Sequence, residues 1–408
     1  MNVWSLALRN VGRNRRRSLL TGGVIVFGFA AFALAGGFMA QTLEGLREGT
    51  IRSGVGHLQF ARAAAFEPGG DSSLDAGLPW TEDLDRELKD APDVVEVLPR
   101  IEFVGLLSNG SRSVPFLGVG LDPEREARTM DHPSDLASGR WLHDRDERAV
   151  VLGGGLARSL GVVVGDEITV LATTTDGTLN ALDALVVGLA DIPVRELNDR
   201  FLAAPLQLAS ELLDTPGRVS KVVVVLRDYR LAPTSLTRLE ARLRSSGDDI
   251  VGKTWEDLAV FYRQVRLLYF GIFGFMGAVL VAVVLLASAN TMMMAVSERT
   301  REIGTLRALG TRPRLIRRLL VAEGVVLAVA GCAVGTVLAL LIRLALNHSG
   351  IMLPPPPGIT HGAPLHVKFY GLAYAVGAVA MLATLVAASY LPARRAARMP
   401  IVEALAHV

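Results

Sequence analysis

Four long stretches of the chain carry almost no charge, and they limit its fold more than any motif does. Only Glu323 and Arg343, both in the third stretch, are charged. The stretches are residues 19–40, 267–294, 319–346 and 369–391. Each is long enough to cross a hydrocarbon layer of about 30 Å as a helix. Together with a 50% hydrophobic composition and a mean hydropathy of +0.38, they predict a membrane protein with four transmembrane helices.

The region between the first and second stretches has a mixed pattern that is typical of a globular domain. Short apolar runs predict seven strands, at 57–60, 101–107, 114–119, 149–152, 168–172, 185–190 and 221–226. Longer amphipathic segments predict helices at 81–90, 154–160, 205–214 and 233–245. The predicted fold class is an α-helical integral membrane protein with four transmembrane helices and a large α+β extracytoplasmic domain between helices 1 and 2.

The distribution of arginine predicts the orientation. Five arginines precede the first stretch, seven lie from Arg299 to Arg318, and Arg394, Arg395 and Arg398 follow the last. The loop 347–368 contains one lysine and no arginine. Because basic loops stay in the cytoplasm, both termini and residues 297–318 are expected there, and residues 41–266 outside the bacterial inner membrane, as a periplasmic or extracellular region.

These signals divide the chain into four parts. They are a cytoplasmic interfacial helix at 1–18, transmembrane helix 1 with a stalk at 19–53, an extracytoplasmic core domain at 54–254, and a stalk with the remaining three transmembrane helices at 255–408. A cleaved signal peptide is the competing interpretation of the N-terminus, since Ala33-Leu34-Ala35 resembles a cleavage site. The apolar run continues past that site, which favours a retained helix.

A charged segment, SERTREIGTLRALG at 297–310, separates the second and third stretches. Its pattern predicts a short amphipathic helix that ends at Gly310 and could offer a docking surface to a cytoplasmic protein. An ordinary solvated loop is the alternative. The candidate docking residues are Glu298, Arg299, Arg301, Glu302, Ile303, Leu306, Arg307 and Leu309. If residues 255–309 form one nearly continuous helix, they make a rod of about 80 Å.

One motif suggests an enzyme. Residues 247–254, GDDIVGKT, match the phosphate-loop pattern G-x-x-x-x-G-K-T. The mechanism of that loop requires a strand before it, whereas 236–244 reads as a helix, and Asp248 and Asp249 would repel phosphate. The segment also falls in the extracytoplasmic region, where ATP is absent. Nucleotide binding is therefore not expected in this chain.

Other chemical sites have weaker signals. His348, His361 and His366 share one loop but have no acidic or cysteine residue beside them, so no metal site is predicted. Glu323 lies about one turn inside the third stretch and can be paired with Arg317, Arg318 or the interface, with a proton or substrate role as the alternative. The single cysteine, Cys332, excludes an intrachain disulfide. No catalytic residue, resident cofactor or nucleic-acid site is predicted.

Three groups of residues resemble the FtsX-like permeases of MacB/LolCDE-type (type VII) ABC transporters. They are Leu6-Ala7-Leu8-Arg9-Asn10 with Arg15-Arg16-Arg17, then 297–310, and the tail Pro392-Ala393-Arg394-Arg395-Ala396-Ala397-Arg398 with Glu403-Ala404-Leu405. The order and length of the predicted helices extend the resemblance over the whole chain, and the layout is most similar to LolC and LolE.

The resemblance implies a non-catalytic permease subunit whose segment 297–310 is the coupling helix of a separate cytoplasmic ATPase dimer. ATP and magnesium would bind to that partner, because no ATPase is fused to this sequence. It also implies a second permease copy or paralogue, and movements relayed to the extracytoplasmic domain. Lipoprotein release is the favoured expectation, with a lipoprotein substrate or a periplasmic partner.

Two alternatives remain open. One is MacB-like efflux of a drug, peptide or other amphiphilic substrate. The other is a mechanical signalling subunit that activates an extracytoplasmic enzyme such as a cell-wall hydrolase. All three readings share the coupling helix and differ in what the outer domain contacts.

Overall fold

The computed structural model describes residues 3–13, 15–66, 77–130, 136–243, 250–355, 362, 364–400 and 404. Its contacts divide the chain into two compact units. The helical unit comprises Met1–Glu44, Gln264–Met352 and Pro364–Val408, and the α+β unit comprises Gly45–Arg263 and Leu353–Ala363. The two units are described separately below.

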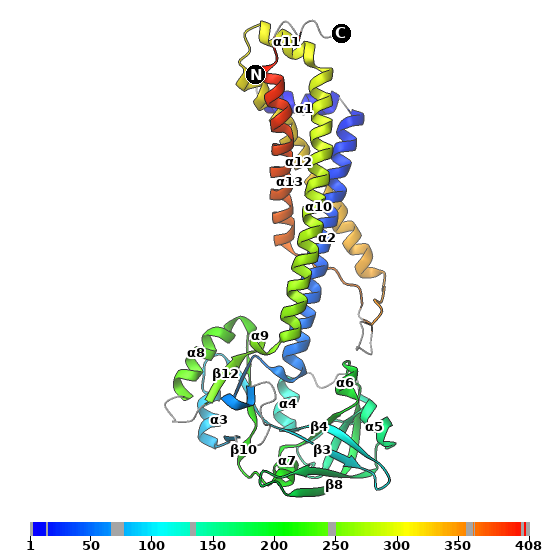
Figure 1. The fold of residues 1–408 in the computed structure, drawn as a ribbon, viewed down its shortest axis with the longest axis vertical. Helices are drawn as coiled ribbons and strands as arrows, with labels where there is room; N and C mark the ends of the chain where they lie inside the picture. The colour runs from blue at the N-terminus through cyan, green and yellow to red at the C-terminus, as the bar shows by residue number, and fades with distance from the viewer. Residues whose placement is uncertain are drawn as a thin grey trace. The chain divides into compact units, whose positions relative to one another are not determined.

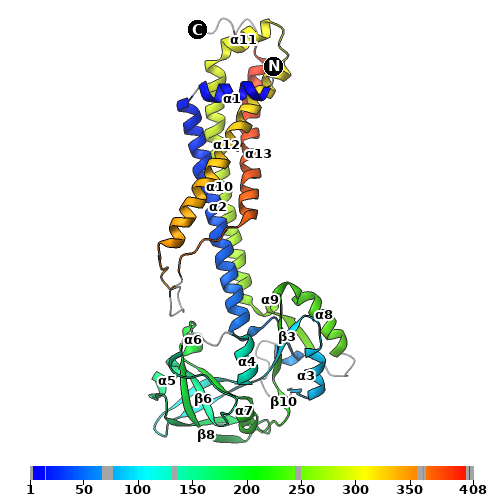
Figure 2. The same cartoon turned by 180° about the vertical axis from the view of Figure 1, so that it is seen from behind.

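Six helices build the helical unit, and four of them are long and apolar enough to span a membrane, as predicted. Those four lie side by side in Figures 1 and 2, with α1 and α11 at one end of the bundle. The helices are α1 (Val3–Arg13), α2 (Arg15–Thr50), α10 (Val260–Glu298), α11 (Thr300–Ala308), α12 (Pro313–His348) and α13 (Gly371–Arg398).

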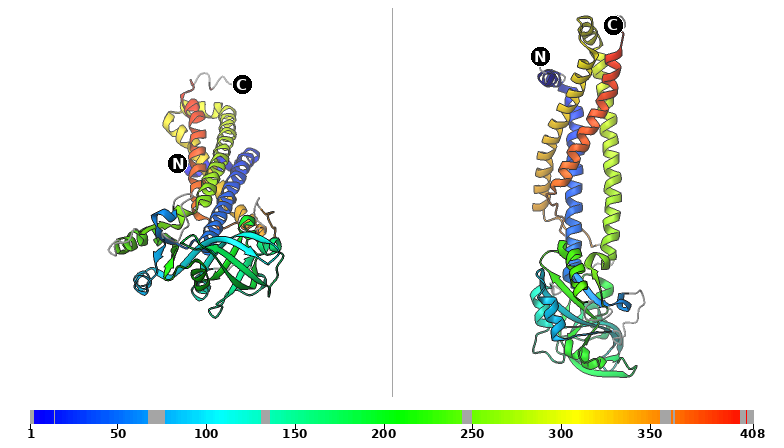
Figure 3. Two further views of the ribbon diagram at one scale, coloured as in Figure 1. Left: turned by 60° about the horizontal axis from the view of Figure 1, so that its bottom comes forward. Right: turned by 90° about the vertical axis from the view of Figure 1, so that its left-hand side faces the viewer.

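The bundle core lies where α2 meets the other three spans. Phe29 is fully buried beside Met381 and Leu385, and its ring packs edge to face on Tyr374. A Cβ atom at Gly335 would come within 3.0 Å of the Val26 carbonyl oxygen, so a glycine is needed for the close approach of α12 to α2. Figure 3, right, shows the length over which these helices run together.

The single rod expected over 255–309 is not present. A short helix, α9 (Trp255–Leu258), ends at Ala259, whose φ and ψ are −79° and 65°. A second break occurs at Arg299, where φ and ψ are −108° and 13°. Between the breaks, α10 has 39 residues and a length of about 58 Å. The segment 297–310 therefore contains a separate helix, α11, with its own axis.

The α+β unit continues from the end of α2 with a π-helical turn, η1 (Ile51–Val55), and its described residues form two sheets and seven α-helices. Its strands are β1 (Leu58–Arg62), β2 (Leu78–Pro79), β3 (Val94–Ser108), β4 (Ser113–Leu121), β5 (Leu136–Gly139), β6 (Ala149–Gly153), β7 (Glu167–Thr173), β8 (Leu179–Ala190), β9 (Phe201–Pro205), β10 (Arg218–Val219), β11 (Lys221–Leu226) and β12 (Ile250–Thr254). Its α-helices besides α9 are α3 (Glu82–Lys89), α4 (Pro123–Thr129), α5 (Gly154–Leu160), α6 (Arg195–Asn198) and α7 (Leu206–Leu213) with α8 (Ala232–Leu243). Short 3-10 turns, η2 (Ala63–Phe66) and η4 (Tyr229–Leu231), complete it.

Strand β3 is shared by two parts of the large sheet. Its first half, up to Arg100, pairs with β11, followed by β1 and β12. Its second half, from Gly105, pairs with β7. In this half the pairings β3–β4, β4–β9, β9–β6, β6–β8, β8–β7 and β7–β3 close a ring of six strands. Figure 3, left, shows this strongly curved part of the sheet.

An apolar cluster in this part of the sheet includes Val151, Ala190 and Ala203. The seven strands predicted from the sequence are all present, and so are the four predicted helices of this unit. Strands β2, β5, β9, β10 and β12 were missed. β9 is short and ends at Pro205, and β12 contains Gly252 and Lys253, residue types that are depleted in strands.

Candidate functional site

Backbone geometry sets both ends of the helix α11. It starts after the break at Arg299, and the Thr300 hydroxyl donates to the Val296 carbonyl at 3.0 Å. It ends where Gly310 adopts a φ of +87°, a conformation that favours glycine. The Thr311 amide then donates to the Leu306 carbonyl at 3.0 Å, which closes the last turn.

The predicted docking residues divide between two sides of α11. Of the three apolar residues in this set, Ile303 is buried, whereas Leu306 is 41% and Leu309 78% exposed. Each step of three residues falls about 60° short of a full helical turn, so Leu306 and then Leu309 lie progressively further from the inward face. The exposed members of the set are Glu298, Arg301, Glu302, Leu306 and Leu309, while Arg299 and Ile303 are buried and Arg307 is half-buried.

The inward side of α11 packs on α12, α13 and the tail that follows α13. Ile303 belongs to an apolar cluster with Ile316, Leu320, Ala393 and others. A Cβ atom at Gly304 would lie 2.8 Å from the Cβ atom of Ala404, so this glycine permits close contact with the tail. The Arg307 guanidinium donates to the Met399 carbonyl. α11 is thus attached on one side and free on the other.

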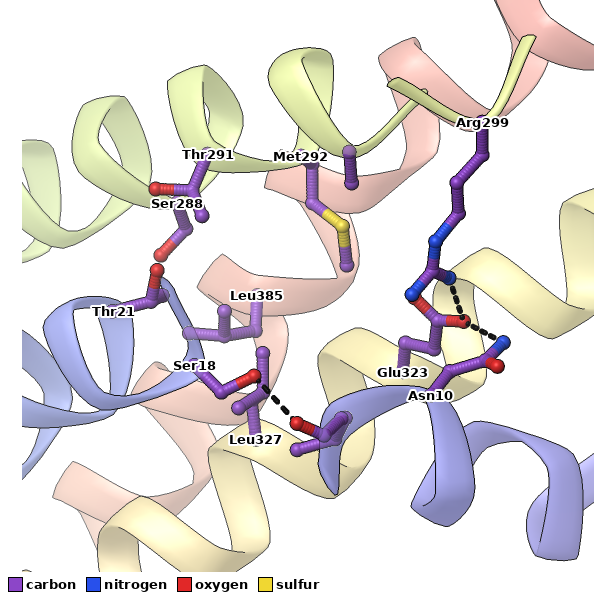
Figure 4. Close-up of a pocket in the computed structure, with 12 residues that line it drawn as sticks. Asn10, Ser18, Thr21, Ser288, Thr291, Met292, Arg299, Glu323, Leu327 and Leu385 are labelled. Atoms are coloured by element: carbon purple, nitrogen blue, oxygen red, sulfur yellow. Dashed lines mark hydrogen bonds and ion pairs between the residues drawn. The ribbon is translucent and has the colours of Figure 1, made fainter. Parts of the chain in front are cut away.

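A buried carboxylate connects the break at Arg299 to two other helices. Figure 4 shows Glu323 of α12 between Arg299 and Asn10 of α1. The Arg299 guanidinium lies 3.3 Å from Glu323 Oε1, and Asn10 Nδ2 donates to the same oxygen at 2.6 Å. The sequence analysis proposed Arg317 and Arg318 as partners of Glu323. The structure instead pairs it with Arg299, and it places Arg317 5.8 Å from the ring centre of Tyr390.

Another contact of α1, with α11, is exposed. Arg13 NH2 lies 3.0 Å from Glu302 Oε1, with both side chains more than half exposed. Exposed ion pairs contribute little to stability, so this pair adds little to the attachment of α11 to the bundle. Sequence reasoning missed both Asn10 and Arg13, since residues almost 300 positions apart give no local periodic signal.

The α+β unit has its own buried ion pair, which fixes the turn η1. Arg100 of β3 binds Glu126 of α4 through two hydrogen bonds, of 2.7 and 2.8 Å. Its NH1 atom donates to the carbonyl of Gly54 at 2.6 Å. Gly54 has a φ of +119°, and a Cβ atom there would lie 2.7 Å from Arg100 NH1. Arg100 can therefore approach this backbone carbonyl only because residue 54 is a glycine.

Two neighbouring groups have shifted pKa values. Burial lowers the pKa of His57, and the charge of Asp228 partly opposes that shift. Its Nδ1 accepts a hydrogen bond from the Leu226 amide at 3.1 Å, which requires that nitrogen to be unprotonated. A hydrogen bond with Asp85 raises the pKa of Arg125, which strengthens the attachment of α4 to α3.

Two family models match the chain. Residues 18–245 match the MacB-like periplasmic core domain, and residues 274–401 match the FtsX-like permease C-terminal model. The first match covers more than half of the chain. The chain belongs to the FtsX-like permeases that carry a MacB-like periplasmic core domain.

Several relatives resemble this permease over most of its length. The lipoprotein-releasing system transmembrane protein LolE of Haemophilus influenzae is 25% identical over 78% of the chain and 79% of its own length. LolC of Xylella fastidiosa is 25% identical over 77% of the chain and 78% of its own length. The macrolide export ATP-binding/permease protein MacB of Nitrobacter winogradskyi is 27% identical over 96% of the chain, which spans 58% of that protein. The chain is thus a membrane-embedded permease subunit of an ABC transporter of the LolC/LolE and MacB type.

The phosphate-loop match in the permease lies partly outside the described residues, which begin again at Ile250. Gly252, Lys253 and Thr254 lie in β12, where Lys253 pairs with Gln59 of β1. The Gly252 amide donates to Glu240 Oε1 at 3.0 Å, so a carboxylate occupies the place of a phosphate. The helix that follows has four residues. A lysine within a paired strand does not form the phosphate cradle of that motif.

The histidine loop of the permease is described only in part, since His361 lies outside the described residues. His348 Nδ1 lies 2.9 Å from the Leu344 carbonyl oxygen of its own helix, and His366 is exposed. Within the described part of the chain, no group of three His, Cys, Asp or Glu side chains is arranged to hold a metal ion.

Proposed function

We propose that this permease converts ATP hydrolysis by a separate cytoplasmic ATPase dimer into movement of its extracytoplasmic unit. The observation that carries the proposal is the division of α11 into an attached side and a free side. Leu306 and Leu309 are large apolar side chains exposed between Arg301, Glu302 and other charged residues. A short helix with this surface suits a groove on another protein, in which the leucines would be buried.

The proposed coupling site is narrower than the set predicted from the sequence. Glu298, Arg301, Glu302, Leu306 and Leu309 are exposed, and we assign the contact with the partner to them. Arg299, Ile303 and Arg307 instead hold α11 on the bundle through Glu323, the apolar cluster and the tail. Force on the free side would reach α10 and α12 through these attachments.

The proposal places both termini and α11 in the cytoplasm and the α+β unit outside the inner membrane. The arginine-rich segments near α1, α11 and the end of α13 support this orientation. ATP and magnesium would bind only to the partner, and the permease itself would supply no catalytic group.

A second permease copy or paralogue completes the proposed assembly. Several large apolar side chains of α10, among them Phe270, Phe275 and Leu286, are exposed. Lipid chains and a neighbouring permease both suit such a surface.

Lipoprotein release, or transport of another amphiphilic molecule, is the proposed task. The similarity to LolE and LolC over more than three quarters of the chain supports it. Efflux is the second candidate, because the alignment with a macrolide exporter covers 96% of the chain. A signalling role would require the outer unit to bind an enzyme in place of a transported molecule.

The double substitution Leu306→Ser and Leu309→Ser tests the proposed coupling. Each leucine buried in a groove contributes about 1.5–3 kcal/mol, so the loss of both predicts at least about tenfold less ATPase in the purified complex. The measurement is vanadate-sensitive ATP hydrolysis of the complex purified through a tag on the permease. Leu179→Ser, at an exposed leucine of the α+β unit, is the matched control and should change nothing. Equal ATPase activity in the double variant, with normal membrane insertion, would refute the coupling role of α11.

A further inference from the structure

A cavity lies inside the helical unit, directly behind the break between α10 and α11. Its lining includes Thr21 of α2, Ser288 and Met292 of α10, and the pair Arg299 and Glu323. Its volume is about 40 Å³. A water molecule needs about 10–15 Å³ by this measure, so the cavity has room for about three.

Most hydroxyl groups of the spans form a hydrogen bond within their own helix. Thr291, Thr336, Thr384 and Ser389 each donate to the carbonyl four residues earlier in the same helix, at 2.7 or 2.8 Å. This is the usual way in which a hydroxyl is satisfied inside a membrane helix.

Thr21 and Ser288 do not follow that pattern. Their side-chain oxygens are buried and form no hydrogen bond with any residue that the structure describes. The residues are only 4% and 1% exposed. In Figure 4 the Thr21 hydroxyl points toward α10 and the Ser288 hydroxyl toward α2. A buried hydroxyl without a partner is costly, so these two groups indicate a polar ligand in the cavity.

The charges of the lining residues favour a neutral ligand over an ion. Among the lining residues that the structure describes, the charged ones are Arg299 and Glu323, which have opposite signs and are paired. This pair offers no excess charge to a cation or an anion. The hydroxyls, the carboxylate and the guanidinium can all bond with water.

We propose that this cavity is an internal hydration site, in which a small cluster of water molecules links the Thr21 and Ser288 hydroxyls to the Arg299–Glu323 pair. The role of this water in the movement of α11 rests on the proposed function. If α11 tilts when the ATPase closes, the ion pair can lengthen while water takes over its hydrogen bonds. The break at Arg299 then acts as a hinge at which water replaces the hydrogen bonds that the movement breaks.

X-ray hydroxyl-radical footprinting of the full chain in nanodiscs tests this site. Radicals form from water next to the side chain that they oxidise, and methionine reacts readily. Met292 lines the cavity and is 7% exposed, whereas Met381 is also buried, at 2%, but lies in the apolar bundle core. We expect Met292 to be oxidised several-fold faster than Met381. Equal protection of both methionines, as a lipid chain in the cavity would produce, overturns the proposal.

A double variant separates hydration from simple exposure. Thr21→Val with Ser288→Ala keeps the shape but removes both hydroxyls, so the part of the cavity between α2 and α10 loses its polar partners, and apolar cavity space stays dry. The Met292 oxidation rate should fall toward that of Met381. Thr384→Val is the matched control, because its hydroxyl is satisfied within α13 and lies outside the cavity lining.

An unchanged Met292 rate in the double variant would also overturn the proposal. If that variant does not fold, the comparison of Met292 with Met381 in the wild-type protein still decides the question. The footprinting requires no ATPase, so its failure is distinguishable from failure of the coupling proposal, which the leucine variants test.

Discussion

Each unit of this permease contains a buried arginine–glutamate pair, and the two pairs are built differently. In the α+β unit, Arg100 makes two short bonds to Glu126 and a third to the Gly54 carbonyl. In the helical unit, Arg299 approaches one oxygen of Glu323 at 3.3 Å beside a cavity. The first pair is fully engaged and fixes one geometry. The second is loosely engaged, which suits a place where helices change their contacts.

The largest expected effect tests the rigid pair. Arg100→Met leaves Glu126 buried without its counter-charge and releases the Gly54 carbonyl, which should destabilise the α+β unit by about 3–5 kcal/mol. Native-state hydrogen exchange of β3 peptides in the full chain measures this loss. Arg140→Gln, which breaks the more exposed Arg140–Asp146 pair, should cost less than about 1 kcal/mol. A similarly small loss in Arg100→Met would show that the pair is not a clamp.

A smaller effect is expected at the loose pair. Glu323→Gln keeps the shape of the side chain and a bond for Asn10 but removes the negative charge facing Arg299. The expected loss is about 1–3 kcal/mol, because one long contact is weakened rather than a fully engaged pair. Hydrogen exchange at the start of α12 provides the measurement, and Glu302→Gln at the exposed Arg13 pair is the control. A loss as large as that of Arg100→Met would contradict the distinction between the two pairs.

The smallest effect is a pH dependence near η1. The pKa of His57 is lowered in the folded state, so the unfolded chain binds more protons below the ordinary value of 6.5. Stability should therefore fall as the pH falls through the interval between the lowered pKa and 6.5, by at most about 1.4 kcal/mol per pH unit. Above 6.5 both states are neutral and the contribution is constant.

Urea unfolding at several pH values, followed by tryptophan fluorescence, measures that dependence. His57→Asn offers the Leu226 amide an acceptor that does not titrate, so this part of the slope should vanish. If wild type and variant have the same slope between pH 5 and pH 6.5, the histidine is not responsible.

Local patterns were sufficient to predict much of this fold. Uncharged runs gave the four spans, because a membrane helix needs a minimum apolar length wherever it packs. Short apolar runs located seven of the strands. β12 could not be found in this way, since its Gly-Lys-Thr sequence forms a strand only through pairing with β1.

The site was predicted less completely. The position of α11 follows from charge and from Gly310, which are local features. Its division into an attached and a free side depends on Ala404 and Met399, whose contacts with α11 are set by tertiary structure. The partner of Glu323 was equally hidden, because nearby Arg317 and Arg318 were the natural choice in sequence. Helix packing, rather than proximity along the chain, selected Arg299.

The closed ring of six strands in the α+β unit has a mechanical consequence. A pull on β3 is shared with β4 on one side and β7 on the other, and both lead back to each other through β8, β6 and β9. No strand of the circle can peel away without breaking two ladders at once. A force applied at Gly54 should therefore move the ring of six strands as one rigid body, and any deformation would be confined to the loops around it.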